Sequence, residues 1–207
     1  MKQFSQKIGI LFVVAFLGAC AGMNPNPGER TADTNWERGN YARAFEVARS
    51  AAEGGSPWAQ LRMGMYYEAG YGVPVDIKEA IHWYQKAAVQ MGEGKWAEGY
   101  VVGATGRAGY FGQQNDALIA RFRLAHIYFN EGQGTEPDLV KAYLLIKNVS
   151  EITNGQNVFF CCDWSSSRWF SAEMIASTKS SIEQAMTTRQ KEEARQRADT
   201  WTIETGL

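Results

Sequence analysis

The spacing of apolar and polar positions is most regular between residues 59 and 88, where it predicts two consecutive helices. Ala59, Met63 and Tyr67 stand four apart, so their side chains share one face of a helix. After a short turn, small and aromatic residues recur with a helical period at Ala80, Trp83, Tyr84, Ala87 and Ala88. The segment therefore predicts an antiparallel pair of helices.

The turn between these two helices has its own sequence signals. Gly70 and Gly72 adopt positive φ angles at little cost, so they end the first helix. Pro74 reinforces the break, because it cannot continue a helix. Asp76 is a suitable N-cap for the second helix, with Glu79 three residues later as in a capping box.

The apolar residues of the second helix are of two kinds. Trp83 and Tyr84 each offer an area on the order of 150 to 250 Å² for burial. The alanines at Ala80, Ala87 and Ala88 let neighbouring helix backbones approach closely. Neither helix buries such a face alone, so we expect the pair to stack on further copies of itself.

Weaker echoes of this pattern occur further along the chain. The residues around Trp58 recur 38 residues later around Trp96, which predicts the start of a middle copy. Residues 99–113 hold five glycines, too many for a stable helix interior, so we expect an irregular insertion there. A last copy has its matching positions at Leu124, Ala125, Tyr128, Gly132, Gly134, Asp138, Ala142 and Tyr143.

Together these features resemble the Sel-one-like repeat, a relative of the tetratricopeptide repeat in which helix pairs stack into a superhelix. The resemblance is carried by Gly64, Tyr67, Gly70, Gly72, Val73, Asp76, Ala80, Trp83, Tyr84, Ala87 and Ala88 in the first copy, and by Tyr128, Gly132, Gly134, Asp138 and Ala142 in the last. It implies an all-α fold, a short right-handed α-solenoid of antiparallel helix pairs. Such a solenoid offers an extended concave face for binding.

The flanking segments fit the same plan. Residues 39–52 have the pattern of a second helix, so we interpret them as an incomplete first unit. Residues 186–201 resemble the closing helix often found in this family, and Thr187 with Gln190 forms a capping box. The charged residues between 189 and 197 supply the polar outer face that a terminal repeat needs.

Residues 1–19 have the composition of a secretory signal peptide, with Lys2 and Lys7 before an apolar stretch at residues 8–17. That stretch is shorter than the ~20 residues that a permanent transmembrane helix needs. The sequence Leu-Gly-Ala-Cys, ending at Cys20, resembles a bacterial lipobox and implies cleavage and lipidation of Cys20. The alternative is an ordinary secreted protein with an incidental cysteine.

The remaining chain divides into a tether and a domain. Residues 20–33 are rich in glycine, asparagine and proline, which predicts a flexible tether, and the lipobox resemblance implies that this tether is lipidated at Cys20. We assign the solenoid to residues 34–204, with insertions near 99–113 and 152–169. A lipid anchor implies membrane attachment in the bacterial cell envelope, at the outer membrane and facing the periplasm. The net charge is −1, or about −3 without the signal peptide, and no basic patch appears, so we expect no nucleic-acid partner.

Two adjacent cysteines, Cys161 and Cys162, allow two interpretations. In an oxidising compartment they could form a vicinal disulfide, but adjacent Cα atoms lie closer than an unstrained disulfide prefers. Otherwise they are buried reduced thiols that pack as small apolar residues. Two sulfurs without nearby further ligands do not make a zinc site, so we expect no metal.

The segment 152–169 is rich in aromatic residues but lacks the period of a repeat helix. One hypothesis is that its aromatic side chains pack over the last repeat. The other is that Phe160, Trp164 and Trp169 project into a partner, since aromatic anchors dominate interface energies.

Catalytic chemistry finds little support in the sequence. His82 and His126 occupy unrelated repeat positions, and no nucleophile elbow, phosphate-binding loop or histidine metal motif occurs. We therefore expect no enzyme activity and no cofactor, but a protein-binding module. Resemblance to periplasmic lipoproteins of this class implies an immunity protein that neutralises a secreted toxic effector such as a lipase. The alternatives are an envelope assembly or signalling adaptor, or a protein that binds cell-wall glycan.

Overall fold

The computed structural model describes residues 27–90, 112–130, 137–156, 158–159 and 169–207. The helices in this part of the chain are α2 (Pro27–Glu37), α3 (Tyr41–Glu53), α4 (Pro57–Ala69), α5 (Ile77–Ala88), α6 (Gly112–Phe129), α7 (Leu139–Thr153), α8 (Ala172–Ala185), α9 (Thr188–Ala198) and α10 (Ile203–Gly206). The strands are β1 (Val158–Phe159) and β2 (Trp169–Phe170).

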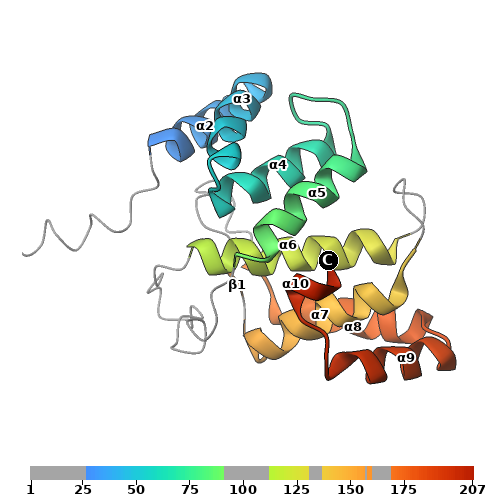
Figure 1. Ribbon diagram of the computed structural model, residues 1–207. Helices are drawn as coiled ribbons and strands as arrows, with labels where there is room; N and C mark the ends of the chain where they lie inside the picture. The colour runs from blue at the N-terminus through green and yellow to red at the C-terminus, as the bar shows by residue number, and fades with distance from the viewer. Residues whose placement is uncertain (1–26, 91–111, 131–136, 157, 160–168) are drawn as a thin grey trace, which may run out of the picture.

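Successive helices pack on one another in chain order, from α2 and α3 at the top of Figure 1 to α8 and α9 at the bottom. Helices α8 and α9 both pack on α7. The expected all-helical array of sequential helix pairs is therefore confirmed. One addition is the short antiparallel pairing of β1 with β2, in which Val158 faces Phe170.

The turn between α4 and α5 forms as its sequence indicates. Helix α4 ends at Gly70, whose φ of 75° lies in the left-handed region where a side chain would be strained. The Asp76 side chain accepts hydrogen bonds from the backbone N–H groups of Lys78 and Glu79, which confirms it as the N-cap of α5.

Close packing of α4 on α5 depends on a small residue facing a large one. A Cβ atom added to Gly64 would lie 2.4 Å from the ring of Tyr84, so only glycine lets this fully buried tyrosine lie against α4. Ala80, Ala87 and Ala88 are fully buried, and Trp83 is almost so. The signature residues of the first repeat are thus packing residues.

The core consists of two clusters of buried apolar side chains. The smaller lies among α2, α3 and α4, includes Phe45, Trp58 and Tyr66, and reaches Trp83 of α5. The larger extends from α4 and α5 through α6 and α7 to the C-terminal helices, with Leu61 and Tyr84 at one end and Ile182 and Ile203 at the other.

The expectations for the N-terminal part need two corrections. Residues 27–33 were expected to belong to the tether, but α2 starts at Pro27 and buries Ala32 completely. The Asp33 carboxylate pairs with the guanidinium of Arg62 on α4 at 3.1 Å, with both side chains mostly buried. The first unit is therefore a full helix pair, α2 with α3, because this burial and ion pair hold α2 in the array.

The internal boundaries also differ from expectation. Helix α6 packs directly on both α4 and α5, so the first and last predicted copies are adjacent repeats. The middle copy predicted at Trp96 lies outside the described residues, as does most of the 99–113 insertion. The insertion predicted from residue 152 begins slightly later, since α7 continues to Thr153.

The C-terminal helices follow their capping signals. Thr187 and Gln190 form the predicted reciprocal capping box at the start of α9, with Thr187 N–H donating to Gln190 Oε1 at 2.9 Å. Within the part of the chain that the structure describes, no helix has both the length and the apolar character needed to cross a membrane.

Candidate functional site

Three aromatic side chains, Trp36, Tyr41 and Tyr71, meet at the surface and are called the aromatic triad below. Their ring centroids lie 5.0 Å (Trp36 to Tyr41), 4.4 Å (Trp36 to Tyr71) and 5.0 Å (Tyr41 to Tyr71) apart. Tyr41 is 38% exposed and Tyr71 is 36% exposed. Trp36 also stacks on the buried ring of Tyr66, which anchors the triad to α4.

Two interhelical turns bring the triad together. Tyr41 begins α3 directly after the α2–α3 turn, and Tyr71 lies between Gly70 and Gly72 in the α4–α5 turn. A Cβ atom on Gly72 would lie 2.6 Å from the carbonyl oxygen of Tyr41, so the two turns are in backbone contact. The glycines were predicted from the sequence, but the triad was not. A signal was available, since Tyr71 adjoins both turn glycines.

The shape of the triad limits what it contacts. The ring planes meet at 63°, 76° and 46°, so they offer no flat aromatic platform. Their centroids are too close for another ring or a cation to enter between them. The triad is a compact aromatic cluster, and Val75, which is 60% exposed, lies in the same turn as Tyr71.

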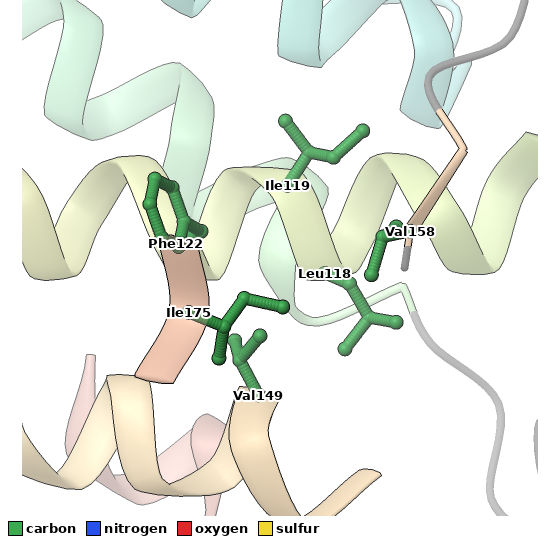
Figure 2. Close-up of a pocket in the computed structure, with 6 residues that line it drawn as sticks. All are labelled: Leu118, Ile119, Phe122, Val149, Val158 and Ile175. Carbon is green, nitrogen blue, oxygen red and sulfur yellow. The ribbon is translucent and has the colours of Figure 1, made fainter. Parts of the chain in front are cut away.

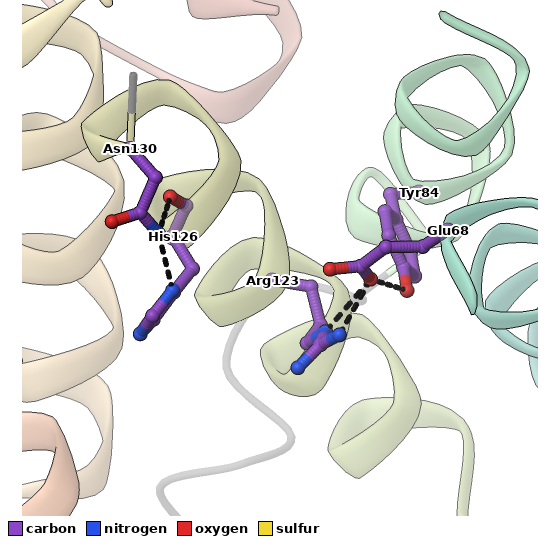
Figure 3. A network of polar contacts seen from close by, with 5 residues as sticks. All are labelled: Glu68, Tyr84, Arg123, His126 and Asn130. Atoms are coloured by element: carbon purple, nitrogen blue, oxygen red, sulfur yellow. Dashed lines mark hydrogen bonds and ion pairs between the residues drawn. The ribbon is translucent and has the colours of Figure 1, made fainter. Parts of the chain in front are cut away.

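A second feature is a polar junction between the two repeats, shown in Figure 3. The Glu68 Oε2 atom of α4 accepts hydrogen bonds from the Tyr84 hydroxyl of α5 at 2.6 Å and from Arg123 Nε of α6 at 3.0 Å. It also lies 2.6 Å from Arg123 Nη2. Burial, and then the Glu68 charge, raise the pKa of Tyr84 well above its ordinary value, so its hydroxyl stays a donor.

His126 continues this junction along α6. Asn130 Nδ2 lies 2.8 Å from His126 Nδ1 and donates to the His126 carbonyl oxygen at 2.8 Å (Figure 3). Burial, and then the positive charge of Arg123, lower the pKa of His126, which favours its neutral form at pH 7. His82 is exposed on α5 and faces Trp83. His82 therefore lies at the surface, whereas His126 packs within the junction.

A narrow apolar pocket lies among α6, α7, α8 and β1 (Figure 2). Its lining consists of Leu118, Ile119, Phe122, Val149, Val158 and Ile175. All six are buried, and none carries a polar side chain for catalysis or metal binding. The pocket is a narrow gap in the core, at the place where β1 packs over α6.

Several predicted site residues cannot be compared with the structure. Cys20, Phe160, Cys161, Cys162, Trp164, Gly132 and Gly134 lie outside the described residues. Trp169 lies in β2, where its backbone pairs with Phe159. Asp138 caps α7 and Ala142 is fully buried, whereas Tyr128 is partly buried beneath the Lys141 ammonium. Among the described residues, no cluster of three or more His, Cys, Asp or Glu side chains could hold a metal.

Two segments of the chain, residues 59–88 and 118–147, match the Sel1 repeat family. They coincide with the pairs α4–α5 and α6–α7. No curated protein matches the chain. Among solved structures, it is similar to a protective antigen present in uropathogenic Escherichia coli strains that displays an SLR fold.

That similarity has a TM-score of 0.57 and 20% sequence identity, and it covers 90% of this chain and 32% of the antigen chain. The present chain thus spans about a third of that structure, and the likeness shows the fold alone. The two matched segments are similar to Sel1 repeats, a kind of module that typically mediates protein–protein interaction.

Proposed function

From two Sel1 repeats in an SLR fold, we propose that this chain is a protein-binding module without catalytic activity of its own, and that the aromatic triad is a principal contact. The single observation that carries the choice of surface is the exposure of Tyr41 and Tyr71 beside an anchored Trp36. Tryptophan and tyrosine are enriched among residues that dominate interface energies.

The geometry of the triad favours a protein partner over a glycan. Sugar rings stack on a flat, open aromatic face, whereas these rings meet at steep angles. A compact cluster of partly exposed aromatic side chains fits an apolar depression on another protein. Trp36 is already fixed by its stacking on Tyr66, so little side-chain entropy is lost when it is covered.

The narrower form of the proposal is an immunity protein that binds and neutralises a secreted toxic effector such as a lipase. An immunity protein forms a tight, exclusive complex, whereas an envelope adaptor makes weaker contacts with several resident proteins. Co-expression of the chain with a captured toxic partner separates the two roles, because only an immunity protein restores growth.

The interaction is tested by affinity capture from envelope extracts of the source cell with the full chain immobilised. We expect the double substitution Tyr41→Ala and Tyr71→Ala to weaken the captured complex at least about tenfold, equivalent to about 1.4 kcal/mol. Met174→Ala is the matched control, because Met174 is 45% exposed on the distant helix α8. Equal binding by the double variant and the control would show that the triad is not part of the interface. Hydrolase activity of the purified chain without any bound protein would overturn the binding function.

We further propose that the chain is lipidated at Cys20 and anchored at the bacterial outer membrane, facing the periplasm. The support is the charged, apolar and small-residue order of residues 1–20. Two or more acyl chains anchor a protein stably. Mass spectrometry of the cellular protein should find an acylated Cys20 as the first residue, and Cys20→Ser should move the chain to the soluble fraction. An unmodified Cys20 in membrane-bound protein would exclude this anchor.

A further inference from the structure

The segment Trp201–Leu207, called the strap below, turns back from α9 across the two Sel1 repeats. Figure 1 shows its helix, α10, lying against the middle of the array near α6 and α7. The main-chain carbonyl oxygen of Leu207 accepts hydrogen bonds from Gln85 Nε2 of α5 at 3.1 Å and from Lys141 Nζ of α7 at 3.3 Å. The strap therefore bridges the second helices of both repeats.

The strap is a compact turn with an apolar face. Ile203 is 7% exposed within the larger core cluster, and Trp201 and Leu207 pack against that cluster. A Cβ atom on Gly206 would lie 1.9 Å from Trp201 Nε1, so the indole lies directly on this glycine. Thr202 and Thr205 close the turn with a capping box.

The surface beneath the strap, called the seat, combines one aromatic ring with fixed donors. The Lys141 ammonium lies 4.7 Å from the Tyr128 ring centroid, and Gln85 Nε2 also donates to the Tyr128 hydroxyl at 3.5 Å. These contacts hold both donors toward the position of the Leu207 carbonyl. In the same region, burial lowers the pKa of Arg121 to about 10, and the Glu204 carboxylate acts in the opposite direction.

Binding of the strap in the seat carries a cost in free energy, because it buries a polar group without a partner. The Trp201 indole N–H is buried but has no hydrogen-bond partner in the described part of the chain. A buried donor left without a partner destabilises the contact that buries it. Within the strap, Ile203 alone is buried, and segments with few buried residues open locally at low free energy. A competing segment that avoids this cost could therefore replace the strap.

We propose that the seat formed by Gln85, Tyr128 and Lys141 is a peptide-binding surface, which the strap occupies in cis and from which a segment of a partner protein displaces it. The segment it fits carries an aromatic residue and a branched aliphatic residue two positions later, as Trp201 and Ile203 do, followed by a carbonyl oxygen for the two donors. This inference deepens the proposed protein-binding function and rests on it.

The test measures binding of a fluorescent peptide of residues 199–207 to full-length chains by anisotropy. The unchanged chain should bind weakly, because its own strap fills the seat. Ile203→Glu in the chain releases the strap and should tighten binding of the unchanged peptide at least about tenfold. Gly206→Ala is a second releasing variant that keeps the apolar strap residues and the seat intact. Circular dichroism checks that both variants fold.

The seat itself is tested in the released variants. Adding Lys141→Met should weaken peptide binding at least about fivefold, while Lys147→Met removes a matched charge from the same helix and should leave binding unchanged. A peptide carrying Ile203→Glu should not bind. Equal peptide affinity of the released and unchanged chains would overturn the proposal. Exchange of straps between two released chains, seen as dimers in sedimentation, would overturn the choice of a foreign partner.

These measurements separate the inference from the proposed function. The variant with Tyr41→Ala and Tyr71→Ala should retain peptide binding after strap release, because the triad lies away from the seat. Peptide binding without any captured protein would contradict the proposed function and leave the seat in place. A captured protein whose affinity is unaffected by strap release and by Lys141→Met would contradict the seat alone.

Discussion

At the scale of single residues, one carboxylate oxygen of Glu68 joins three helices. It accepts from the fully buried Tyr84 of α5 and from Arg123 of α6, while Glu68 itself belongs to α4. The Glu68 side chain is 12% exposed and that of Arg123 is 34% exposed. Such a partly desolvated pair is costly to break, because removal of one partner leaves the other uncompensated.

We expect Glu68→Ala to lower the free energy of unfolding by about 2 kcal/mol, because it leaves the Tyr84 hydroxyl and the Arg123 guanidinium without their acceptor. Tyr84→Phe should cost about 1 kcal/mol. Denaturant unfolding of both single variants and the double variant should show a coupling above about 0.5 kcal/mol.

The matched control is Glu151→Ala, which breaks the exposed Lys147–Glu151 pair of α7, in which the Glu151 side chain is 61% exposed. Its effect should stay within about 0.5 kcal/mol. Equal effects of Glu68→Ala and Glu151→Ala would show that the junction does not stabilise the repeat interface.

At the scale of elements, the α4–α5 turn has two roles. It connects α4 to α5, and it packs against the start of α3. Gly72 has a φ of 76°, and its missing side chain admits the Tyr41 carbonyl. Gly39, in the α2–α3 turn, has nearly the same φ of 75°, but a Cβ atom there would meet nothing within 4 Å. Substitution of each glycine in turn therefore separates the cost of backbone strain from the cost of steric contact.

We expect Gly39→Ala to cost about 1 kcal/mol, from left-handed strain alone. Gly72→Ala should cost at least about 1 kcal/mol more, because the turn must also move away from α3. Thermal and denaturant unfolding of the two variants measure the difference. Equal losses of stability in the two variants would mean that the turn moves away from α3 without a cost in free energy.

Sequence patterns predicted elements that end in strong local signals. Gly70 and Asp76 mark the boundary of α4 and α5, and Thr187 marks the start of α9. Helix α2 was missed, because Pro27 and the polar residues after it resemble a linker and only Ala32 and Trp36 form its apolar face. Packing on α3, together with the Asp33–Arg62 ion pair and the stacking of Trp36 on Tyr66 of α4, stabilises this helix more than its own propensity does.

At the scale of the whole molecule, the sequence did not indicate which helix pairs lie next to each other. The structure packs α6 directly on α4 and α5, whereas the middle copy predicted at Trp96 lies outside the described residues. Similar residue patterns along the sequence do not show which helices are adjacent when an insertion separates two repeats. The triad was missed for a related reason, since its residues come from α2, the start of α3 and the α4–α5 turn. Their proximity follows from stacking and not from spacing along the chain.

The strap changes how the array behaves as a folding unit. In an open solenoid each repeat contacts its neighbours, and stability is a sum of local terms. The bond from Gln85 to Leu207 spans 122 residues and connects the end of the described chain to the first Sel1 repeat. Such a distant contact forms only after α5, α6 and α7 are assembled. We therefore expect the strap to be a late contact that slows unfolding without hastening folding.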